Sequence, residues 1–269
     1  MIPYRFAASA VALSALDGFR VEHDPDTERA DIVLDRPPLN IVSMPERDQL
    51  AAVFAALDRD PAIRVIVLRG AGKDFSSGGN IAGFLEAAPE QVAKLADNVA
   101  APERCTKPVI AAVRGFCFGV GFELALACDF RIASETAEFA LPEMRIGMIP
   151  GSGGSARLLQ MVGIARTKDM AMRARRVKAD EALRWGFITE CVADDALDAA
   201  VARLAAELCT FSPLAQRTLK RVLNHGQHLP LRGAIELEGE AYGRLRSSAD
   251  FKEGVQSFQE KRKPSFRGA

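Results

Sequence analysis

The sequence predicts an α/β fold of repeated strand–strand–helix units, followed by a tail that is entirely helical. Short apolar runs rich in β-branched residues, such as 65–68 and 109–113, are typical of buried strands, and helical patterns follow them. Beyond residue 211 only helical patterns occur. Because the strands are short and the rhythm is strand, strand, helix, the pattern favours stacked ββα units over a doubly wound parallel sheet.

The 269 residues are enough for a substantial core and are predicted to form three parts. Residues 1–18 are interpreted as an N-terminal extension, 19–210 as the core with the active site, and 211–269 as a helical oligomerisation region. Residues 6–16 are alanine-rich and mildly apolar. They are far short of the roughly 20 apolar residues of a membrane span and have little basic charge before them, so we expect a cytoplasmic chain.

The individual elements follow from periodicity and from turn residues. Residues 19–23 and 30–34 alternate apolar and polar side chains around a turn, which predicts a hairpin. Pro45 opens a helix to about residue 58, with Leu50, Val53, Phe54 and Leu57 on one face. The other expected helices are 89–105, 122–128, 152–162, 167–173, 178–185, 195–208, 213–224, 231–245 and 249–261.

Composition excludes several classes of function. Basic and acidic residues both number 35, so no net charge points to nucleic acid or to an anionic membrane as a partner. The five cysteines are scattered without CxxC spacing, and the three histidines include only one close pair, 225 and 228. A disulfide framework and a metal centre are therefore not expected. A reducing compartment is expected for this chain.

Residues 107–154 contain two acids in unusual surroundings. A strand at 109–113 leads through a glycine-rich turn at 116–121 into a helix, so free N–H groups at the helix start can bind a negatively charged oxygen. Glu123 lies in the first helical turn, and Glu143 follows twenty residues later. Alone, Glu123 could be an acid stabilised by the helix dipole by roughly 0.3–1 kcal/mol. Two acids beside apolar residues favour one raised pKa and proton transfer near neutral pH.

A weak internal repeat suggests how the turns are placed. The run VIVLRG followed by FSSGG (65–79) resembles VIAAVRG followed by FGVGFE (109–123). If the two strands are neighbours, the turns converge, and each can offer a backbone N–H to one oxygen. The alternative is that both glycine-rich segments are simply turns.

These motifs resemble those of the crotonase (enoyl-CoA hydratase/isomerase) superfamily, and the similarity extends from about Phe19 onward. The twenty-residue gap between the glutamates is the one found in hydratases of that family. The resemblance implies a spiral of ββα units with a C-terminal helical trimerisation region. The segments that carry it are GVGFELA (119–125), LPE (141–143), GMIPG (147–151), RPPLN (36–40), DFSSGGNI (74–81) and EKRK (260–263).

The resemblance also assigns site residues. It implies that the Gly79 and Val120 amides form an oxyanion hole, that Glu143 donates the α-carbon proton and that Glu123 helps to activate water. The family usually has glycine where Val120 stands and often aspartate where Asn80 stands. The implied substrate- and CoA-binding residues are Ser77, Asn80, Ile81, Phe84, Phe118 and Gly151, with Phe258 and Lys261 reaching CoA bound to a neighbouring subunit. Without the resemblance, Lys261 in its basic run reads as a solvated helix end.

The implied function is hydration of an enoyl-CoA thioester in fatty acid metabolism. The substrate would be an acyl-CoA, with no cofactor apart from its CoA, no metal, and a homotrimer or dimer of trimers as the assembly. A double-bond isomerase or another crotonase-type CoA-thioester enzyme is the alternative within the fold, and a non-catalytic CoA- or RNA-binding scaffold is the alternative outside it. The expected apolar pocket residues, which could equally be core, are Phe84, Leu85, Phe116, Phe118, Leu141 and Met148.

Overall fold

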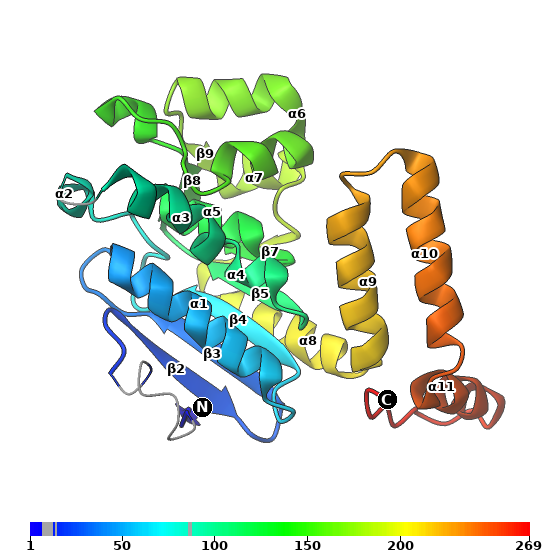
Figure 1. Cartoon of the computed structure of the whole chain (residues 1–269). Coiled ribbons are helices and arrows are strands. Elements are labelled where there is room, and N and C mark those ends of the chain that lie inside the picture. Colours follow the sequence, from blue (N-terminus) through cyan, green and yellow to red (C-terminus); the bar gives the residue numbers. More distant parts are fainter. Residues whose placement is uncertain (7–12, 14, 86–87) are drawn as a thin grey trace.

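The computed structural model describes residues 1–6, 13, 15–85 and 88–269, and it is built around a seven-stranded sheet (Figure 1). The first three strands pair antiparallel and the remaining neighbours pair parallel. In spatial order the strands are β1 (Ile2–Pro3), β2 (Phe19–Asp24), β3 (Arg29–Leu34), β4 (Val65–Gly70), β5 (Val109–Val113), β7 (Phe130–Ser134) and β10 (Glu190–Val192).

Helices cover both faces of this sheet, which explains why β5 is apolar at every position and β4 is apolar from Val65 to Leu68. Val65 and Val67 of β4 pack in one cluster with the helix α8 (Leu197–Cys209). Ile66 and Leu68 belong to the larger core on the other face, with α1 (Met44–Arg59) and α5 (Val120–Ala127). The mixed α/β prediction and the 19–23/30–34 hairpin are confirmed.

A second, smaller sheet was not expected. It contains β6 (Phe116–Phe118), β8 (Glu138–Ala140) and β9 (Val177–Lys178). The interpretation of 116–121 as one tight turn was therefore wrong for its first half. Two phenylalanines flank Cys117, and their backbone pairs with β8, so these three residues extend before Gly119 turns the chain.

Several helix boundaries differ from the expected ones. The helix expected at 89–105 is two helices, α3 (Pro89–Val99) and α4 (Ala101–Arg104), and Pro102 lies in the first turn of the second. The two helices expected at 152–162 and 167–173 are confirmed as the two halves of α6 (Gly154–Met172), which a kink at Gly163, with φ = 79°, separates. The remaining short helices are α2 (Ile81–Phe84), η2 (Glu143–Ile146), α7 (Ala179–Trp185) and η3 (Asp194–Ala196).

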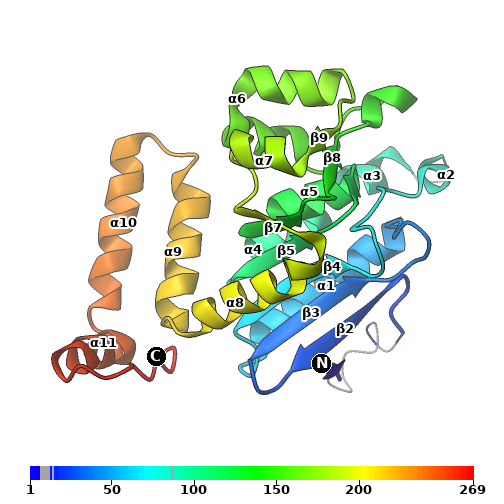
Figure 2. The same ribbon diagram turned by 180° about the vertical axis from the view of Figure 1, so that it is seen from behind.

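The C-terminal region is helical as predicted and projects from one side of the sheet (Figures 1 and 2). It consists of α9 (Pro213–Gly226), α10 (Leu231–Leu245) and α11 (Ala249–Gln259), with α9 and α10 packed as a hairpin. An ion pair of 2.7 Å between Lys220 and Asp129 ties α9 to the core. Among the described residues, no helix has the length and apolar character needed to cross a membrane.

Asn40 connects the loops that shape the site. It is buried, has φ = 50°, and its amide donates to the carbonyls of Ala71 and Asp74 over 3.0 and 2.8 Å. The Asp74 carboxylate in turn accepts a 2.8 Å hydrogen bond from the N–H of Phe116. The turn after β4 is thereby fixed to the start of β6.

We predict that Asn40→Ala lowers the free energy of unfolding by roughly 2–4 kcal/mol, because a buried and a part-buried carbonyl lose their donor and alanine tolerates the positive φ poorly. Urea unfolding followed by circular dichroism measures this change. Asn98→Ala, which removes an exposed hydrogen bond to Asp48, is the matched control and should change stability by less than about 1 kcal/mol. Equal effects of the two substitutions would contradict the role given to Asn40.

Candidate active site

The two glycine turns lie side by side, as the internal repeat predicted. Strands β4 and β5 are parallel neighbours, with Leu68 opposite Ala111. Beyond them the backbone of Ser76 accepts a 2.9 Å hydrogen bond from the N–H of Phe118 and donates one of 2.8 Å to the carbonyl of Phe116. The segments 75–79 and 116–120 are therefore held together by their own backbones.

Each turn presents a backbone amide without a hydrogen-bond partner. Gly79 N–H and Val120 N–H make no hydrogen bond in the part of the chain that the structure describes. Val120 is the first residue of α5, and the positive φ needed to enter that helix, 51°, falls on Gly119. A β-branched residue therefore fits at position 120, because it needs only helical backbone angles. This geometry is compatible with an oxyanion hole.

Glu123 is held rigidly at the start of another helix. Its side chain is only 3% exposed, and Oε1 accepts hydrogen bonds from the N–H groups of Ser152 (2.8 Å) and Gly154 (3.1 Å). Since Gly154 begins α6, the carboxylate lies at a helix N-terminus, where a negative charge is favoured. These two donors, which the sequence did not reveal, fix the orientation of the carboxylate.

Glu143 lies across the same turn. A Cβ added to Gly119 would come within 3.1 Å of Glu143 Oε1, so the carboxylate packs tightly against this glycine. Glu143 Oε2 is buried without a hydrogen-bond partner among the described residues. Burial raises the pKa of Glu143 to about 7, and the negative charge of Glu123 adds to the shift. One acid can therefore keep its proton near neutral pH beside a carboxylate fixed by two amides.

Arg47 is a site residue that the sequence analysis missed. It lies in the first turns of α1, is 3% exposed, and has its guanidinium 5.4 Å from the ring centre of Phe84. A Cβ on Gly79 would lie 2.9 Å from its Nη2 and 3.2 Å from the Phe84 ring. Burial lowers the pKa of Arg47, and the charge of Glu123 opposes that shift. The sequence did contain a signal for a buried arginine, since Arg47 precedes Leu50 by three residues and so shares the apolar face of the helix.

The other predicted binding residues differ in their exposure to solvent. Ser77 is partly buried, and its N–H donates to the carbonyl of Leu39 over 2.9 Å. Asn80 and Ile81 are exposed at the start of α2, and Gly151 is exposed beside Ser152. These residues surround the two turns in the fold, and their roles stay predictions.

The aromatic and C-terminal candidates are less closely connected to the glutamates. Phe118 is nearly buried, with its ring 4.9 Å from that of Phe116 and 4.9 Å from the guanidinium of Arg176. Phe258, at the end of α11, is 86% exposed, and both views place α11 apart from α5. The structure of one chain does not bring Phe258 or Lys261 to the site, so their predicted roles require a neighbouring subunit.

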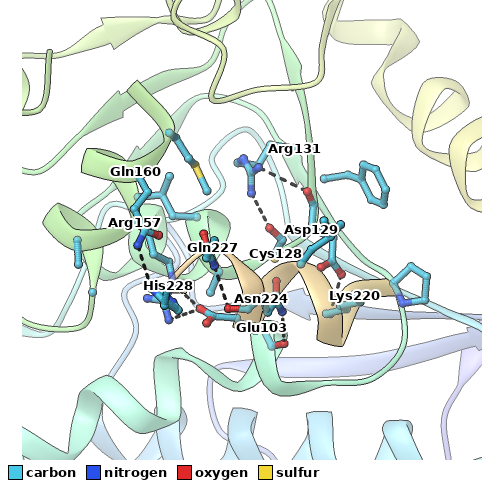
Figure 3. Close-up of a pocket in the computed structure, with 18 of the residues that line it drawn as sticks. Glu103, Cys128, Asp129, Arg131, Arg157, Gln160, Lys220, Asn224, Gln227 and His228 are labelled. Carbon is cyan, nitrogen blue, oxygen red and sulfur yellow. Dashed lines mark hydrogen bonds and ion pairs between the residues drawn. The ribbon is translucent and has the colours of Figure 1, made fainter. Parts of the chain in front are cut away.

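A separate pocket lies between α9 and the core (Figure 3). Its lining includes neither glutamate of the site and neither free amide. Two ion pairs lie in its lining, Lys220 with Asp129 at 2.7 Å and Arg157 with Glu103 at 2.6 Å, and Arg131 donates to backbone carbonyls there. The pocket therefore belongs to the packing of the tail. No cluster of three metal-ligating side chains occurs in the described ranges, His225 and His228 included.

Comparison with known proteins agrees with this fold. The family model described as enoyl-CoA hydratase/isomerase matches residues 28–269. A carnitinyl-CoA dehydratase of Citrobacter koseri is 37% identical over 264 residues, 91% of this chain and 96% of the relative. An enoyl-CoA hydratase structure from Bacillus anthracis has a TM-score of 0.87 and 31% identity, over 94% of this chain and all of its own. An enoyl-CoA hydratase/carnitine racemase structure from Magnetospirillum magneticum has a TM-score of 0.85 and 30% identity, over 98% of this chain and 100% of its own.

The fold and the matches define an enzyme of the hydro-lyase class, from a family that acts on CoA thioesters. The chain belongs to the enoyl-CoA hydratase/isomerase family, within the crotonase superfamily.

The raised pKa of Glu143 predicts a pH-dependent stability difference between the native chain and Glu143→Gln. The carboxyl group has an ordinary pKa of 4.5 and a folded value of about 7. As the pH rises through this window the unfolded state loses its proton first, so folding becomes less favourable. Glutamine does not titrate, so Glu143→Gln lacks this pH-dependent contribution to the free energy of folding. The melting temperature of Glu143→Gln relative to the native chain should therefore rise between pH 5 and pH 8.

Burial also raises the pKa of Glu46 to about 7, but this second acid does not disturb the comparison. Both proteins retain Glu46, so its contribution cancels in the difference. Differential scanning fluorimetry at several pH values suffices. A difference that stays constant from pH 5 to pH 8 would show that Glu143 titrates normally in the folded state.

Proposed function

We propose that this enzyme is an enoyl-CoA hydratase, which adds water across the 2,3 double bond of an enoyl-CoA thioester. The observation that carries the proposal is the pair of acids at one glycine turn. Glu123 is fixed by two backbone donors, and Glu143 has a pKa of about 7 beside two free amides. This arrangement suits a base and an acid that act on one substrate at neutral pH.

In the proposed reaction the thioester oxygen accepts hydrogen bonds from Gly79 N–H and Val120 N–H. Glu123 removes a proton from water as the water oxygen bonds to C3, and the π electrons move onto the thioester oxygen to form an enolate. Glu143 then delivers its proton to C2. Each oxyanion donor typically contributes a factor of about 10²–10³ in rate. The same groups in reverse would remove water from a 3-hydroxyacyl-CoA.

Two alternatives remain within this fold. The carnitinyl-CoA dehydratase relative suggests dehydration of a 3-hydroxyacyl-CoA, which uses the same site in the opposite direction. A double-bond isomerase would need one base to move a proton between carbons. Two acids at one turn favour hydration or dehydration over isomerisation. A non-catalytic scaffold would not need them.

The further expectations from the sequence complete the proposal. The substrate's own CoA is the expected nucleotide, with no separate cofactor or metal. The expected setting is a cytoplasmic one in fatty acid metabolism. Neither expectation affects the chemistry at Glu123 and Glu143.

We predict that Glu123→Gln and Glu143→Gln each lower crotonyl-CoA hydration by at least about 10²-fold, because both acids serve the same step. The double mutant should be much less than additively worse, as expected for residues that act as a unit. Steady-state loss of the conjugated-thioester absorbance measures this rate.

Conversion of 3-enoyl to 2-enoyl thioester by the same samples is the parallel assay. A native enzyme that hydrates poorly, together with a Glu123→Gln enzyme that shifts the double bond at the native rate, would assign the protein as an isomerase. CoA-thioester binding without turnover of any enoyl-CoA would favour the scaffold.

The tail is proposed to assemble the enzyme. Large apolar side chains stand exposed on its helices, which normally marks an interface. We predict a light-scattering mass of three or six times the 29.0 kDa chain at micromolar concentration. A mass near 29.0 kDa would contradict this and leave Phe258 and Lys261 without a route to CoA. The exposed apolar residues of the tail include Leu219, Leu223, Leu231, Ile235, Tyr242 and Phe258.

A further inference from the structure

Arg47 is a buried cation that the proposed reaction does not use. Its side chain makes no hydrogen bond and no ion pair with the described residues, and its Nε is buried without a partner. Burying a charged group without hydrogen-bond partners is costly.

Arg131, the other buried arginine in the described ranges, shows how the chain otherwise treats such a group (Figure 3). Its guanidinium donates to the carbonyls of Phe187 (2.5 Å), Ala125 (3.1 Å), Cys128 (2.6 Å) and Asp129 (3.5 Å). Arg131 therefore has a structural role, and its hydrogen bonds are all made within one chain. Arg47 is also buried but makes none of these contacts, so its donors are available to a ligand.

The position of Arg47 decides which ligand it can meet. Its Nη2 lies against the α-carbon of Gly79, where a Cβ would come within 2.9 Å, and its guanidinium faces the ring of Phe84. Gly79 supplies one of the two proposed oxyanion donors. A substrate whose thioester oxygen binds there places its acyl carbons within reach of this guanidinium.

No neighbouring carboxylate forms a hydrogen bond or an ion pair with Arg47 in the described part of the chain. Glu123 interacts with it only through space, and Glu123 Oε1 already accepts two backbone hydrogen bonds. Glu46 Oε2 accepts from the N–H of Ser43 at 3.2 Å and pairs with Arg36 at 3.4 Å. No carboxylate oxygen of the described residues lies within the 4.0 Å ion-pair distance of Arg47.

We propose that Arg47 is a specificity-determining residue that binds a carboxylate on the acyl chain, so that the preferred substrate is the CoA monothioester of a short unsaturated dicarboxylic acid. This inference rests on the proposed function and names its substrate class. A guanidinium binds a carboxylate through two parallel N–H···O bonds, and the water-poor surroundings strengthen them. An acyl group that carries a quaternary ammonium at the same place meets a like charge and is disfavoured.

Three substrates with one enoyl core test the proposal. Crotonyl-CoA, glutaconyl-CoA and crotonobetainyl-CoA carry hydrogen, a carboxylate and a trimethylammonium group, respectively, on C4. We expect the native enzyme to favour glutaconyl-CoA over crotonyl-CoA in kcat/KM by roughly 10- to 100-fold, the range for a hydrogen bond to a charged group. Crotonobetainyl-CoA should be the poorest of the three.

Substitution of Arg47 should change the ratios of kcat/KM between these substrates. Arg47→Leu should abolish the preference for glutaconyl-CoA and raise the crotonobetainyl-to-crotonyl ratio. Arg47→Lys, which keeps the charge without the planar fork, should retain a reduced preference of the same sign. Arg184→Leu removes an exposed guanidinium that pairs with Asp180 and should keep the native ratios. Circular dichroism and melting temperature confirm that each variant folds.

Other outcomes would overturn the proposal. Equal kcat/KM of the native enzyme for crotonyl-CoA and glutaconyl-CoA would do so. So would an Arg47→Leu enzyme that loses activity on all three substrates by the same factor, because Arg47 would then act only through Glu123. In either case hydration of crotonyl-CoA leaves the proposed function standing.

A binding assay separates the two proposals if no substrate is turned over. Calorimetric titration with the saturated analogues glutaryl-CoA and butyryl-CoA should show tighter binding of glutaryl-CoA by the native protein, lost in Arg47→Leu. That result without hydration supports the carboxylate site while the hydratase assignment fails. Equal affinity for the two analogues overturns the carboxylate site.

Discussion

The candidate site depends on the backbone hydrogen bonds that join Ser76 to Phe116 and Phe118. They continue the parallel alignment of β4 and β5 past the ends of both strands, so two glycine turns distant in sequence lie side by side. The free N–H groups of Gly79 and Val120 lie just beyond the residues that make these bonds. Asn40 and Asp74 secure the same junction from the side, with hydrogen bonds to buried backbone groups.

Beside these turns, the fold places three ionisable side chains in surroundings that penalise charge. Glu123 is supported by the N-terminus of α6, and Glu143 lacks such donors for Oε2. Their environments differ, so the two glutamates do not behave alike, and burial raises the pKa of Glu143. Arg47 supplies positive charge near Glu123. A carboxylate held by two amides, an acid of raised pKa and a buried cation thus share one small region.

Much of the fold followed from local patterns. Continuous apolar runs predicted the buried strands, proline and glycine marked helix boundaries, and the tail was correctly assigned as helical. The errors came where tertiary contacts override local preference. The segment Phe116–Phe118 contains two aromatic residues next to a glycine turn, yet it is a strand because β8 pairs with it. The expectation of two helices within residues 152–173 was correct, since Gly163 has non-helical backbone angles and separates the two halves of α6.

The sequence by itself determined which chemical groups are present and their order along the chain: two glycine turns, each after an apolar strand, and two glutamates twenty residues apart. Only the tertiary structure decided how those groups differ. Sequence cannot show that Ser152 and Gly154 donate to Glu123, that Glu143 faces Gly119, or that a lone arginine on an apolar helix face meets Gly79. The reason is physical: a pKa and an unpaired charge depend on burial and on neighbours from distant segments, and packing alone brings these together.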